Sequence, residues 1–338
     1  MSDSILRSAF GRLPPVSRRD RRIRELEQRL EQLRAENARV ERELASGDQL
    51  TRPSFRARIH AERRLRALGV EMGVPSTSVI RHGKFYVYDL ARSHGIDVPE
   101  QYAQWDDPAD IAWDELPDLV VIKSAFSSTS RGVFPLQRNG PGWKIITHDR
   151  VMTANELTTA LADLVETGRA RPPFAAEEFL DHDGTGARLP IDVRVLSFYG
   201  EVPVVALRQT LEHGNAGTTL WRYVDRHGSD LLDEHPALVV DQTIPVPTAL
   251  DELCESASRL SVAIRAPFSR IDMYAIGDRV VFGEVTPRPG GPQWFGPEVD
   301  LMLGDAWERA MTRLSRDLVD GMSPDPDFGP DRRGTPIV

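Results

Sequence analysis

Lysine, cysteine and long apolar runs are all scarce in this chain of 338 residues. The single cysteine, Cys254, excludes an internal disulfide and is typical of a reducing compartment. No run of about 18 apolar residues is present, so the sequence predicts no transmembrane helix. The N-terminus lacks the apolar segment of a secretory signal. We therefore expect a cytoplasmic protein, and a hydrophobic content of 40% indicates a globular one.

Lysine occurs only at Lys84, Lys123 and Lys144, whereas the other 39 of the 42 basic residues are arginine. Arginine serves well as a surface cation, but lysine is a compact point charge on a flexible stem that reaches a phosphate through a narrow space. The three lysines are therefore candidates for chemistry. The alternative is a residual compositional bias, and position along the chain has to decide between the two.

The arginines are concentrated near the N-terminus. Residues 1–70 contain 17 Arg and 10 Asp or Glu, although the whole chain has a net charge of −9. A basic arm on an acidic body suits nucleic acid, an anionic membrane surface or an acidic partner, and the alternative is a solvated helix. Because the arm lacks interleaved aromatic residues, we expect no nucleic-acid partner.

Residues 20–45 predict a helix with a heptad repeat, which is typical of a coiled coil. An asparagine at an a position of the repeat sets the register of paired helices. We expect the partner to be a second copy of the chain or another protein, and the alternative is a single helix packed on its own body. The repeat comprises Ile23, Leu26, Leu30, Leu33, Asn37, Val40 and Leu44.

Mixed α and β structure is expected from about residue 70 onward, after a second Arg-rich helix over 53–68. Thr153 and Glu156 have the capping-box spacing at the start of a helix. Gly277 and Asp278, between two apolar runs, predict a β-hairpin. The tail after residue 320 is expected to be loose. The other expected helices are 85–94, 154–166 and 250–264, and the expected strands are 119–123, 143–147, 174–180, 191–199, 202–207, 270–276 and 279–285.

Two acidic residues lie on the arms of the predicted hairpin. Side chains alternate along a strand, so Asp272 faces Glu284 if the loop comprises residues 277–279. With a two-residue turn, Asp272 would face Gly283 instead. Opposed carboxylates repel each other unless a cation lies between them, and Mg²⁺ prefers such oxygen ligands. The alternative is that each carboxylate pairs with a nearby arginine, for which the candidates are Arg270, Arg279 and Arg288.

Lys123 ends an apolar strand and precedes a loop rich in small residues, 124–133. Backbone N–H groups and hydroxyls in such a loop bind anions, and the lysine adds positive charge. The loop lacks the Gly-Lys-Ser/Thr ending of a Walker A motif. Further along the chain, residues 176–180 supply a strand edge that can contact a base, and Asp192 is an acidic residue that can accept ribose hydroxyls.

These motifs occur in the order of the ATP-grasp superfamily, which residues 75–310 resemble. Three stretches are most similar to the teichuronopeptide-biosynthesis (TupA-like) branch, which is associated with cell-envelope polymers: 105–107, 116–123 and 270–284. The six ordered motifs are Lys84 ahead of Gly95–Pro99, Lys123 with its loop, Glu177–Leu180, Asp192–Arg194, Ser269–Asp272 and Gly283–Gly290.

The resemblance implies an α/β (α+β) protein with the ATP-grasp fold and a central lid subdomain, preceded by an N-terminal α-helical coiled-coil extension. The implied segments are a basic helical extension over 1–70, the N-terminal part of the body over 71–124, the lid over 125–180, the C-terminal subdomain with the Mg-ATP site over 181–320, and a flexible tail over 321–338.

The resemblance also implies ATP and Mg²⁺ as cofactors. Lys84 and Lys123 fall on the lysines that contact the phosphates, and Arg270 falls on the arginine that steadies the transferred phosphoryl group. Asp192 falls near the acid that binds ribose. The hinge beside adenine corresponds to Glu177, Phe179 and Leu180, and the loop that closes over the phosphates corresponds to Ser128, Thr129, Ser130 and Gly132.

The metal ligands implied by the resemblance are Asp272 and Glu284. Thr286 lies where the usual second ligand is asparagine, and because its side chain is shorter, the number of metal ions stays open. Two further departures are serines in place of lid glycines and an insertion over 181–190. Lys144 matches no role.

The activity implied is ATP-dependent ligation of a carboxylate and an amine through an acyl phosphate, in cell-envelope polysaccharide or natural-product biosynthesis. Alternatives are a kinase that phosphorylates a hydroxyl and a non-catalytic adapter recruited by the coiled coil. The partners would be a small or polymer-linked carboxylate and an amine. The candidate catalytic residues are Lys123, Arg194 and Arg270. The candidate carboxylate-binding residues are Arg208, Arg222 and Arg288.

Overall fold

The computed structural model divides the chain into two units, Met1–Pro53 and Ser54–Val338. In the first unit the structure describes only residues 20, 23, 26, 27, 30, 31, 34 and 53. The predicted coiled coil over 20–45 therefore lies largely outside the described residues, and its partner stays a prediction. In the second unit the structure describes residues 54–330 except 75–78, 127–131, 149, 181–188, 214, 232–237, 278 and 289–294.

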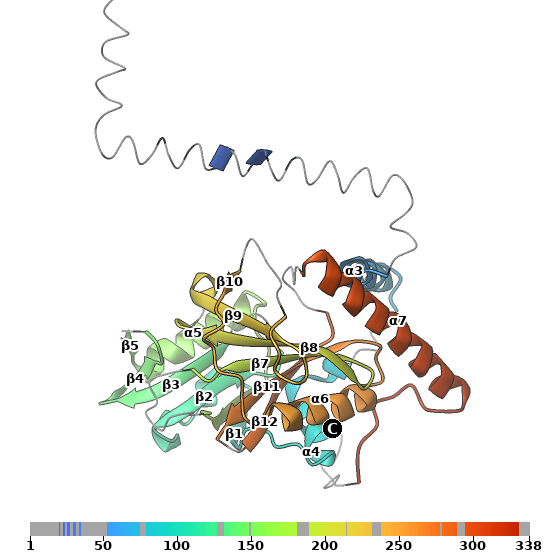
Figure 1. Ribbon diagram of the computed structural model, residues 1–338. Helices are drawn as coiled ribbons and strands as arrows, with labels where there is room; N and C mark the ends of the chain where they lie inside the picture. Colours follow the sequence, from blue (N-terminus) through green and yellow to red (C-terminus); the bar gives the residue numbers. More distant parts are fainter. Residues whose placement is uncertain are drawn as a thin grey trace, which may run out of the picture. The chain divides into compact units, whose positions relative to one another are not determined.

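The second unit is built on two six-stranded sheets (Figure 1). In the first sheet all neighbouring strands are antiparallel. Its strands, in spatial order, are β1 (Gln101–Trp105), β6 (Phe174–Glu178), β2 (Leu119–Ser124), β3 (Val133–Asn139), β4 (Gly142–Ile145) and β5 (Val151–Met152).

The second sheet is antiparallel except for the short edge pair β10 and β9. Its strands, in spatial order, are β10 (Val239–Val240), β9 (Thr219–Val224), β8 (Glu201–Thr210), β7 (Asp192–Phe198), β11 (Ser269–Ile276) and β12 (Arg279–Thr286). Sheets and helices occur in one unit without regular β-α-β alternation, so the predicted α+β class is confirmed.

Helix α5 (Ala154–Glu166) covers the first sheet. The predicted capping box is confirmed, because the Thr153 side chain accepts from the Glu156 backbone while the Glu156 carboxylate accepts from the Thr153 backbone. The buried face of α5 carries Leu157 and Leu161, which pack in the core beneath the strands. The apolar faces of sheet and helix thereby exclude water from each other.

Helices cover both faces of the second sheet. Along β7, Val193 and Val195 join a core with α4 (Lys84–Ser93) and α6 (Leu250–Ile264), whereas Phe198 joins another core with α3 (Phe55–Glu71) and α7 (Pro297–Val319). This division follows from the alternation of side chains along a strand. Short 3₁₀ turns complete the described elements: η2 (Val79–His82), η3 (Pro108–Asp110), η4 (Trp113–Glu115) and η5 (Ala216–Thr218).

Several elements were not predicted. These are the helix α7 and the strands β1, β3, β5, β9 and β10. The predicted boundary between the body and the lid, at residue 124, falls between β2 and β3, which pair along five residues of one sheet. The division into five segments stays a prediction. Among the described residues, no helix is long and apolar enough to cross a membrane.

Candidate active site

The β11–β12 hairpin brings Asp272 opposite Glu284. The sequence predicted this pairing only for a three-residue turn, and the turn is shorter. Arg279 pairs with Ile276, so two residues rather than three connect the strands. The register shifts between Asp272 and Met273, where β12 contains one extra residue, Gly283. A Cβ at Gly283 would lie 2.7 Å from the Tyr274 ring and 3.0 Å from the Asp272 carbonyl oxygen. A glycine β-bulge therefore restores the carboxylate pair.

Arg270 connects the two carboxylates and Thr286. Its Nε and Nη2 donate to the two Asp272 carboxylate oxygens at 2.6 and 2.5 Å. The same Nη2 donates to the Thr286 hydroxyl at 2.9 Å and lies 3.8 Å from Glu284 Oε1. Arg270 and Asp272 are buried, whereas the Glu284 side chain is 43% exposed. Glu284 is therefore the carboxylate that solvent reaches, whereas Arg270 is buried and held in place by its hydrogen bonds.

A second acid–arginine group lies on the neighbouring strands β7 and β8. Asp192 Oδ2 accepts from Arg194 Nε at 2.8 Å and from Arg208 Nη1 at 3.1 Å. The guanidinium carbons of both arginines lie over the Trp221 ring, at 5.3 and 5.8 Å from its centroid. Arg194 pairs in register with Asp272 of β11, so the two groups are adjacent. Cations and carboxylates therefore alternate across three neighbouring strands.

The pKa values of the Asp272 and Asp192 carboxyl groups shift in opposite directions. Burial raises the pKa of Asp272 to about 6, against the attraction of Arg270 and Arg194, and the negative charge of Asp192 adds to the increase. Burial also acts to raise the pKa of Asp192, but Arg194, Arg208 and Arg270 outweigh it and lower that pKa. Asp192 is therefore the firmer anion. One of its oxygens, Oδ1, is buried without a hydrogen-bond partner among the described residues.

Lys123 enters the site from the first sheet. Its Nζ lies 2.6 Å from Glu177 Oε2 and also donates to the Tyr88 hydroxyl, which in turn donates to the same glutamate oxygen at 3.1 Å. Tyr88 belongs to α4, so the three residues join helix and sheet. The Glu177 side chain is 1% exposed, and its Oε1 has no partner in the described part of the chain. That oxygen is available to a ligand that donates a hydrogen bond.

Lys84 lies at the first position of α4. It is close enough to feel the charges of Glu284 on the second sheet and of Lys123 and Glu177 on the first. Burial lowers the pKa of Lys84, Glu284 raises it, Lys123 lowers it and Glu177 raises it. The Tyr88 ring also packs edge-to-face on Phe282 of β12, with centroids 5.8 Å apart. Two lysines separated by 39 positions in the sequence thus act on each other's charge near the hairpin carboxylates. Together with the positive end of the α4 dipole, they favour an anion here.

The donor set fits a divalent cation that shares its ligands with a phosphate group. Mg²⁺ is commonly held by one or two carboxylates together with phosphate oxygens and water. Asp272 and Glu284 supply two carboxylates, and among the described residues no group of three or more His, Cys, Asp and Glu could form a complete protein cage. Arg270 already binds both oxygens of Asp272, so Glu284 is the more accessible ligand.

Residues 180–308 match the family model described as TupA-like ATPgrasp. The resemblance to the ATP-grasp superfamily and its TupA-like branch is thereby confirmed for a segment that contains Asp192, Arg194, Arg270, Asp272 and Glu284. No curated protein matches the chain.

Solved structures of ATP-grasp ligases are similar at low identity. D-Alanine–D-alanine ligase from Bacillus anthracis complexed with ATP is 15% identical with a TM-score of 0.44, over 75% of this chain and 76% of that one. ATP-grasp ligase PsnB complexed with a minimal precursor is 15% identical with a TM-score of 0.39, over 68% of this chain and 61% of that one. Macrocyclase MdnC bound with precursor peptide MdnA, from Microcystis aeruginosa MRC, is 13% identical with a TM-score of 0.39, over 75% and 70%.

Other predicted residues lie in or beside this site. Phe179 and Leu180 are buried directly after β6, which carries Glu177. Gly132 is buried, and its carbonyl accepts from the Ser124 backbone at 3.0 Å, one residue beyond Lys123. The rest of the predicted phosphate loop, Ser128, Thr129 and Ser130, lies outside the described residues.

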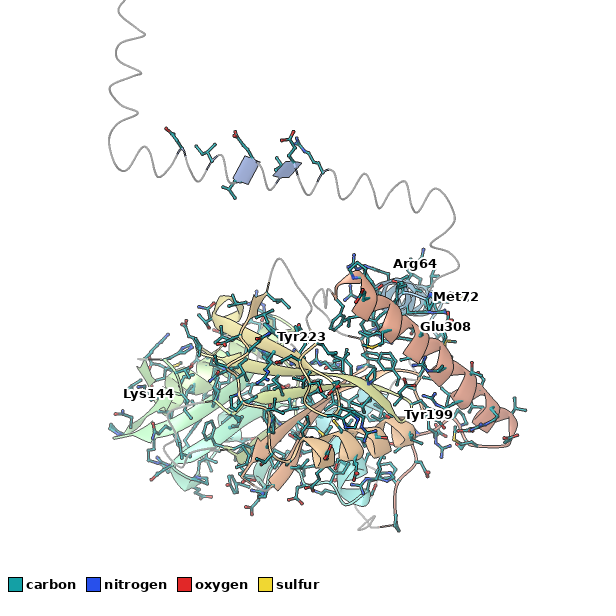
Figure 2. All side chains as sticks on the ribbon, in the orientation of Figure 1. Arg64, Met72, Lys144, Tyr199, Tyr223 and Glu308 are labelled. Atoms are coloured by element: carbon teal, nitrogen blue, oxygen red, sulfur yellow. The ribbon has the colours of Figure 1, made fainter. Side chains whose placement is uncertain are left out.

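Two candidate carboxylate-binding residues and the lysine without a role lie outside the clusters described above. Arg222 binds Asp230 at 2.7 Å and the Ile244 carbonyl at 2.7 Å, so its guanidinium is engaged in a structural contact. Arg288 lines a cavity beside α3. Lys144, which is labelled in Figure 2, lies on β4, and β4 is one strand from the edge of the first sheet.

Tyr88 and Trp221 were not predicted as site residues. Tyr88 follows Lys84 by four positions on a predicted helix, and residues spaced four apart share a helical face. That spacing predicts that Tyr88 lies on the same helical face as Lys84, and so near the site. Trp221 gave no such signal, because its position over Arg194 and Arg208 results from the pairing of β8 with β9.

Proposed function

We propose that this protein is an ATP-dependent carboxylate–amine ligase that forms an amide bond through an acyl phosphate. The observation that carries the proposal is that the charges of Lys123 and Glu284 both act on Lys84, while Arg270 is bonded to Asp272 and lies 3.8 Å from Glu284. The match of residues 180–308 to an ATP-grasp family supports the same activity.

The nucleotide would lie between the two sheets. Lys84 and Lys123 would bind its phosphates, because both ammonium groups and the N-terminus of α4 lie there. Glu177 Oε1 and Asp192 Oδ1 are buried acceptors without partners among the described residues, and ATP offers donors in its base and ribose hydroxyls. Phe179 and Leu180 would border the base, and Ser128, Thr129, Ser130 and Gly132 would close over the phosphates.

The metal would be held by Asp272 and Glu284, with Thr286 at its margin. A bound Mg²⁺ supplies charge neutralisation at the phosphate oxygens. The Thr286 hydroxyl already accepts a hydrogen bond from Arg270 and therefore also positions that arginine. Arg270 and Arg194 would orient the γ-phosphate and the attacking carboxylate, since their guanidinium groups are fork-shaped donors on adjacent strands.

The chemistry needs no nucleophile from the protein. A carboxylate oxygen of the substrate forms a bond to the γ-phosphorus, and ADP leaves. The amine then attacks the acyl carbon, phosphate leaves, and the amine loses a proton. Cys254 is buried in α6, where burial raises the pKa of its thiol to about 11, so it takes no part. Arg208 remains a candidate for carboxylate binding, and the pathway in cell-envelope or natural-product biosynthesis is part of the proposal.

The test is release of ADP by the full chain with Mg-ATP, screened over pairs of carboxylates and amines, with the mass of the product measured. We expect turnover that falls at least about 100-fold in Lys123→Ala and Glu284→Ala. Lys144→Ala is the matched control, because it removes the same charge from a lysine outside the site, and it should retain wild-type turnover.

Three outcomes would contradict the proposal. Turnover that is unchanged in Lys123→Ala and Glu284→Ala would remove these residues from the reaction. A phosphorylated alcohol without an amide would establish a kinase. Nucleotide binding without turnover across the screen would favour an adapter.

A further inference from the structure

The second half of helix α3 carries an exposed apolar stripe. Leu65, Leu68 and the C-cap residue Met72 are between 51% and 75% exposed. Ala61 precedes them, and the four residues follow each other at helical spacings of four, three and four positions. These four residues form the α3 stripe. Monomeric soluble proteins rarely gather large apolar side chains on one exposed surface, so the stripe indicates an interaction site.

The α3 stripe points away from the core that anchors the helix. Phe55 and Ile59 are buried in that core together with residues of α7 and the second sheet. With 3.6 residues per turn, the stripe residues lie about 120–180° around the helix axis from Ile59. The packing of α3 on its own body therefore leaves the stripe in solvent, where a partner can reach it without displacing the helix.

The spacing of the α3 stripe is self-complementary. Positions 61, 65, 68 and 72 are symmetric about the midpoint between residues 66 and 67. A second α3 that runs in the opposite direction therefore places its Leu68 against Leu65 and its Met72 against Ala61. These contacts are the a and d layers of an antiparallel coiled-coil pair. A two-fold axis that relates identical surfaces is the commonest symmetry of protein oligomers.

The charges beside the stripe fit the antiparallel orientation. Arg64 and Glu71 are both exposed on the same flank of the stripe, and Arg64 and Met72 are labelled on α3 in Figure 2. In the antiparallel pair, Arg64 of each copy lies opposite Glu71 of the other, so two ion pairs form across the seam. In a parallel pair, Arg64 would lie opposite Gly69 of the other copy and would gain no counter-charge.

We propose that the α3 stripe binds the α3 stripe of a second copy of this chain in antiparallel orientation, which makes the protein a two-fold symmetric dimer. This inference goes beyond the proposed ligase activity and does not depend on it. A seam of about three helical turns is small for a stable interface. The dimer therefore dissociates on dilution, and each leucine contributes a large share of its stability.

The test is sedimentation equilibrium of the full chain over a series of concentrations. We expect a monomer–dimer equilibrium whose dissociation constant rises at least about tenfold in Leu65→Ala and in Leu68→Ala. The effect is large because one substitution removes two buried side chains from a symmetric dimer. Val70→Ala is the matched control, since Val70 is exposed on the same helix but lies about 140° around the axis from Leu65. Its dissociation constant should stay within about twofold of the wild type.

Denaturant titration separates loss of the dimer from loss of the fold. Leu65 and Leu68 are exposed in the single chain. Below the dissociation constant, their substitution should therefore change the free energy of unfolding little, as is usual for exposed positions.

Exchange of the flanking charges tests the orientation of the two helices. Arg64→Glu and Glu71→Arg should each weaken the dimer about fivefold, because each variant places like charges opposite one another twice. The double variant Arg64→Glu/Glu71→Arg should return the dissociation constant to within about twofold of the wild type.

Three results would overturn the proposal. The chain could sediment as a monomer at every concentration, or the dissociation constant could stay the same in Leu65→Ala and Leu68→Ala, which would assign the dimer to another surface. A double charge exchange that leaves the dimer as weak as the single variants would exclude the antiparallel pairing.

Discussion

Lys123 is held by protein groups before any phosphate arrives. Glu177 supplies the counter-charge at 2.6 Å, and Tyr88 contacts both side chains through one hydroxyl and lies with its ring 4.7 Å from the ammonium. Burial raises the pKa of Tyr88 well above its ordinary value, and Glu177 adds to the increase, so the hydroxyl keeps its proton and donates. Such a group orients a flexible lysine stem that would otherwise sample many rotamers.

We expect Tyr88→Phe to weaken Mg-ATP binding about fivefold, because the hydroxyl that bonds both Lys123 and Glu177 is lost. A net hydrogen-bond contribution of about 1 kcal/mol corresponds to that factor. The measurement is titration with a fluorescent ATP analogue, together with urea unfolding to verify the fold. Tyr102→Phe is the control, since Tyr102 lies 40% exposed on β1 of the same sheet. Equal affinity in the wild type and Tyr88→Phe would show that the hydroxyl does not position Lys123.

The hairpin of β11 and β12 determines the spacing of the carboxylates. A two-residue turn alone would place Asp272 opposite Gly283, and the bulge at Gly283 moves the register by one residue. Only glycine fits, because the Tyr274 ring and the Asp272 carbonyl occupy the space that a Cβ would need.

We expect Gly283→Ala to lower the free energy of unfolding by about 1–3 kcal/mol through overpacking. It should also abolish the thermal stabilisation that Mg-ATP confers, because the carboxylate pair is displaced. Gly69→Ala is the control: its Cβ would meet nothing closer than 3.9 Å in α3, and stability should stay the same or rise by up to about 1 kcal/mol. A folded Gly283→Ala variant with wild-type Mg²⁺-dependent ATP binding would contradict the role of the bulge.

At the scale of the whole second unit, α3 packs on the body through Phe55 and Ile59, and Phe55 makes the aromatic contacts. The Phe55 ring contacts four aromatic rings with centroids 5.1 to 6.0 Å away: Phe198, Phe268, Phe295 and Trp307. Arg58 adds an ion pair with Glu308 of α7 at 2.5 Å, between half-exposed side chains that contribute little. Figure 2 shows Glu308 on α7, beside α3. The apolar contact therefore dominates.

We expect Phe55→Ala to reduce the free energy of unfolding by about 3–5 kcal/mol, as for other buried aromatic truncations. Denaturant titration gives the value. Leu65→Ala, at a position 62% exposed on the same helix, should change it by less than about 0.5 kcal/mol. Similar losses in the two variants would mean that α3 is not anchored through Phe55.

The reactivity of the buried Cys254 thiol measures unfolding of the second unit. Because burial raises the pKa of its thiol to about 11, only about a thousandth of it is thiolate at pH 8. We expect no reaction with Ellman's reagent in the native protein at pH 8 and one thiol per chain in guanidinium chloride. The native rate should increase with pH up to about 11. Rapid modification of the folded protein at pH 8 would contradict the burial of α6.

Local sequence patterns predicted the features that depend only on residues close together in the chain. The capping box of Thr153 and Glu156, the amphipathic helix over 250–264 and the β11–β12 hairpin follow from spacing, and the structure confirms them. The helix α7 was missed, although Pro297 at its first turn and the acidic residues after it are ordinary start signals. Strands β1 and β9 offered weaker patterns, because β1 has no buried residue and β9 does not alternate strictly between buried and less buried positions.

The sequence by itself determined the α+β class, the order of the motifs and the identity of the charged residues. Only the tertiary structure decided which charges meet. Lys84 and Lys123 act on each other because α4 packs near β2, and Arg288 lies beside residues of α3. The Gly283 bulge likewise depends on the Tyr274 ring across the hairpin. Spacing along a chain fixes periodicity and caps, whereas contacts between distant segments depend on packing, which no local pattern encodes.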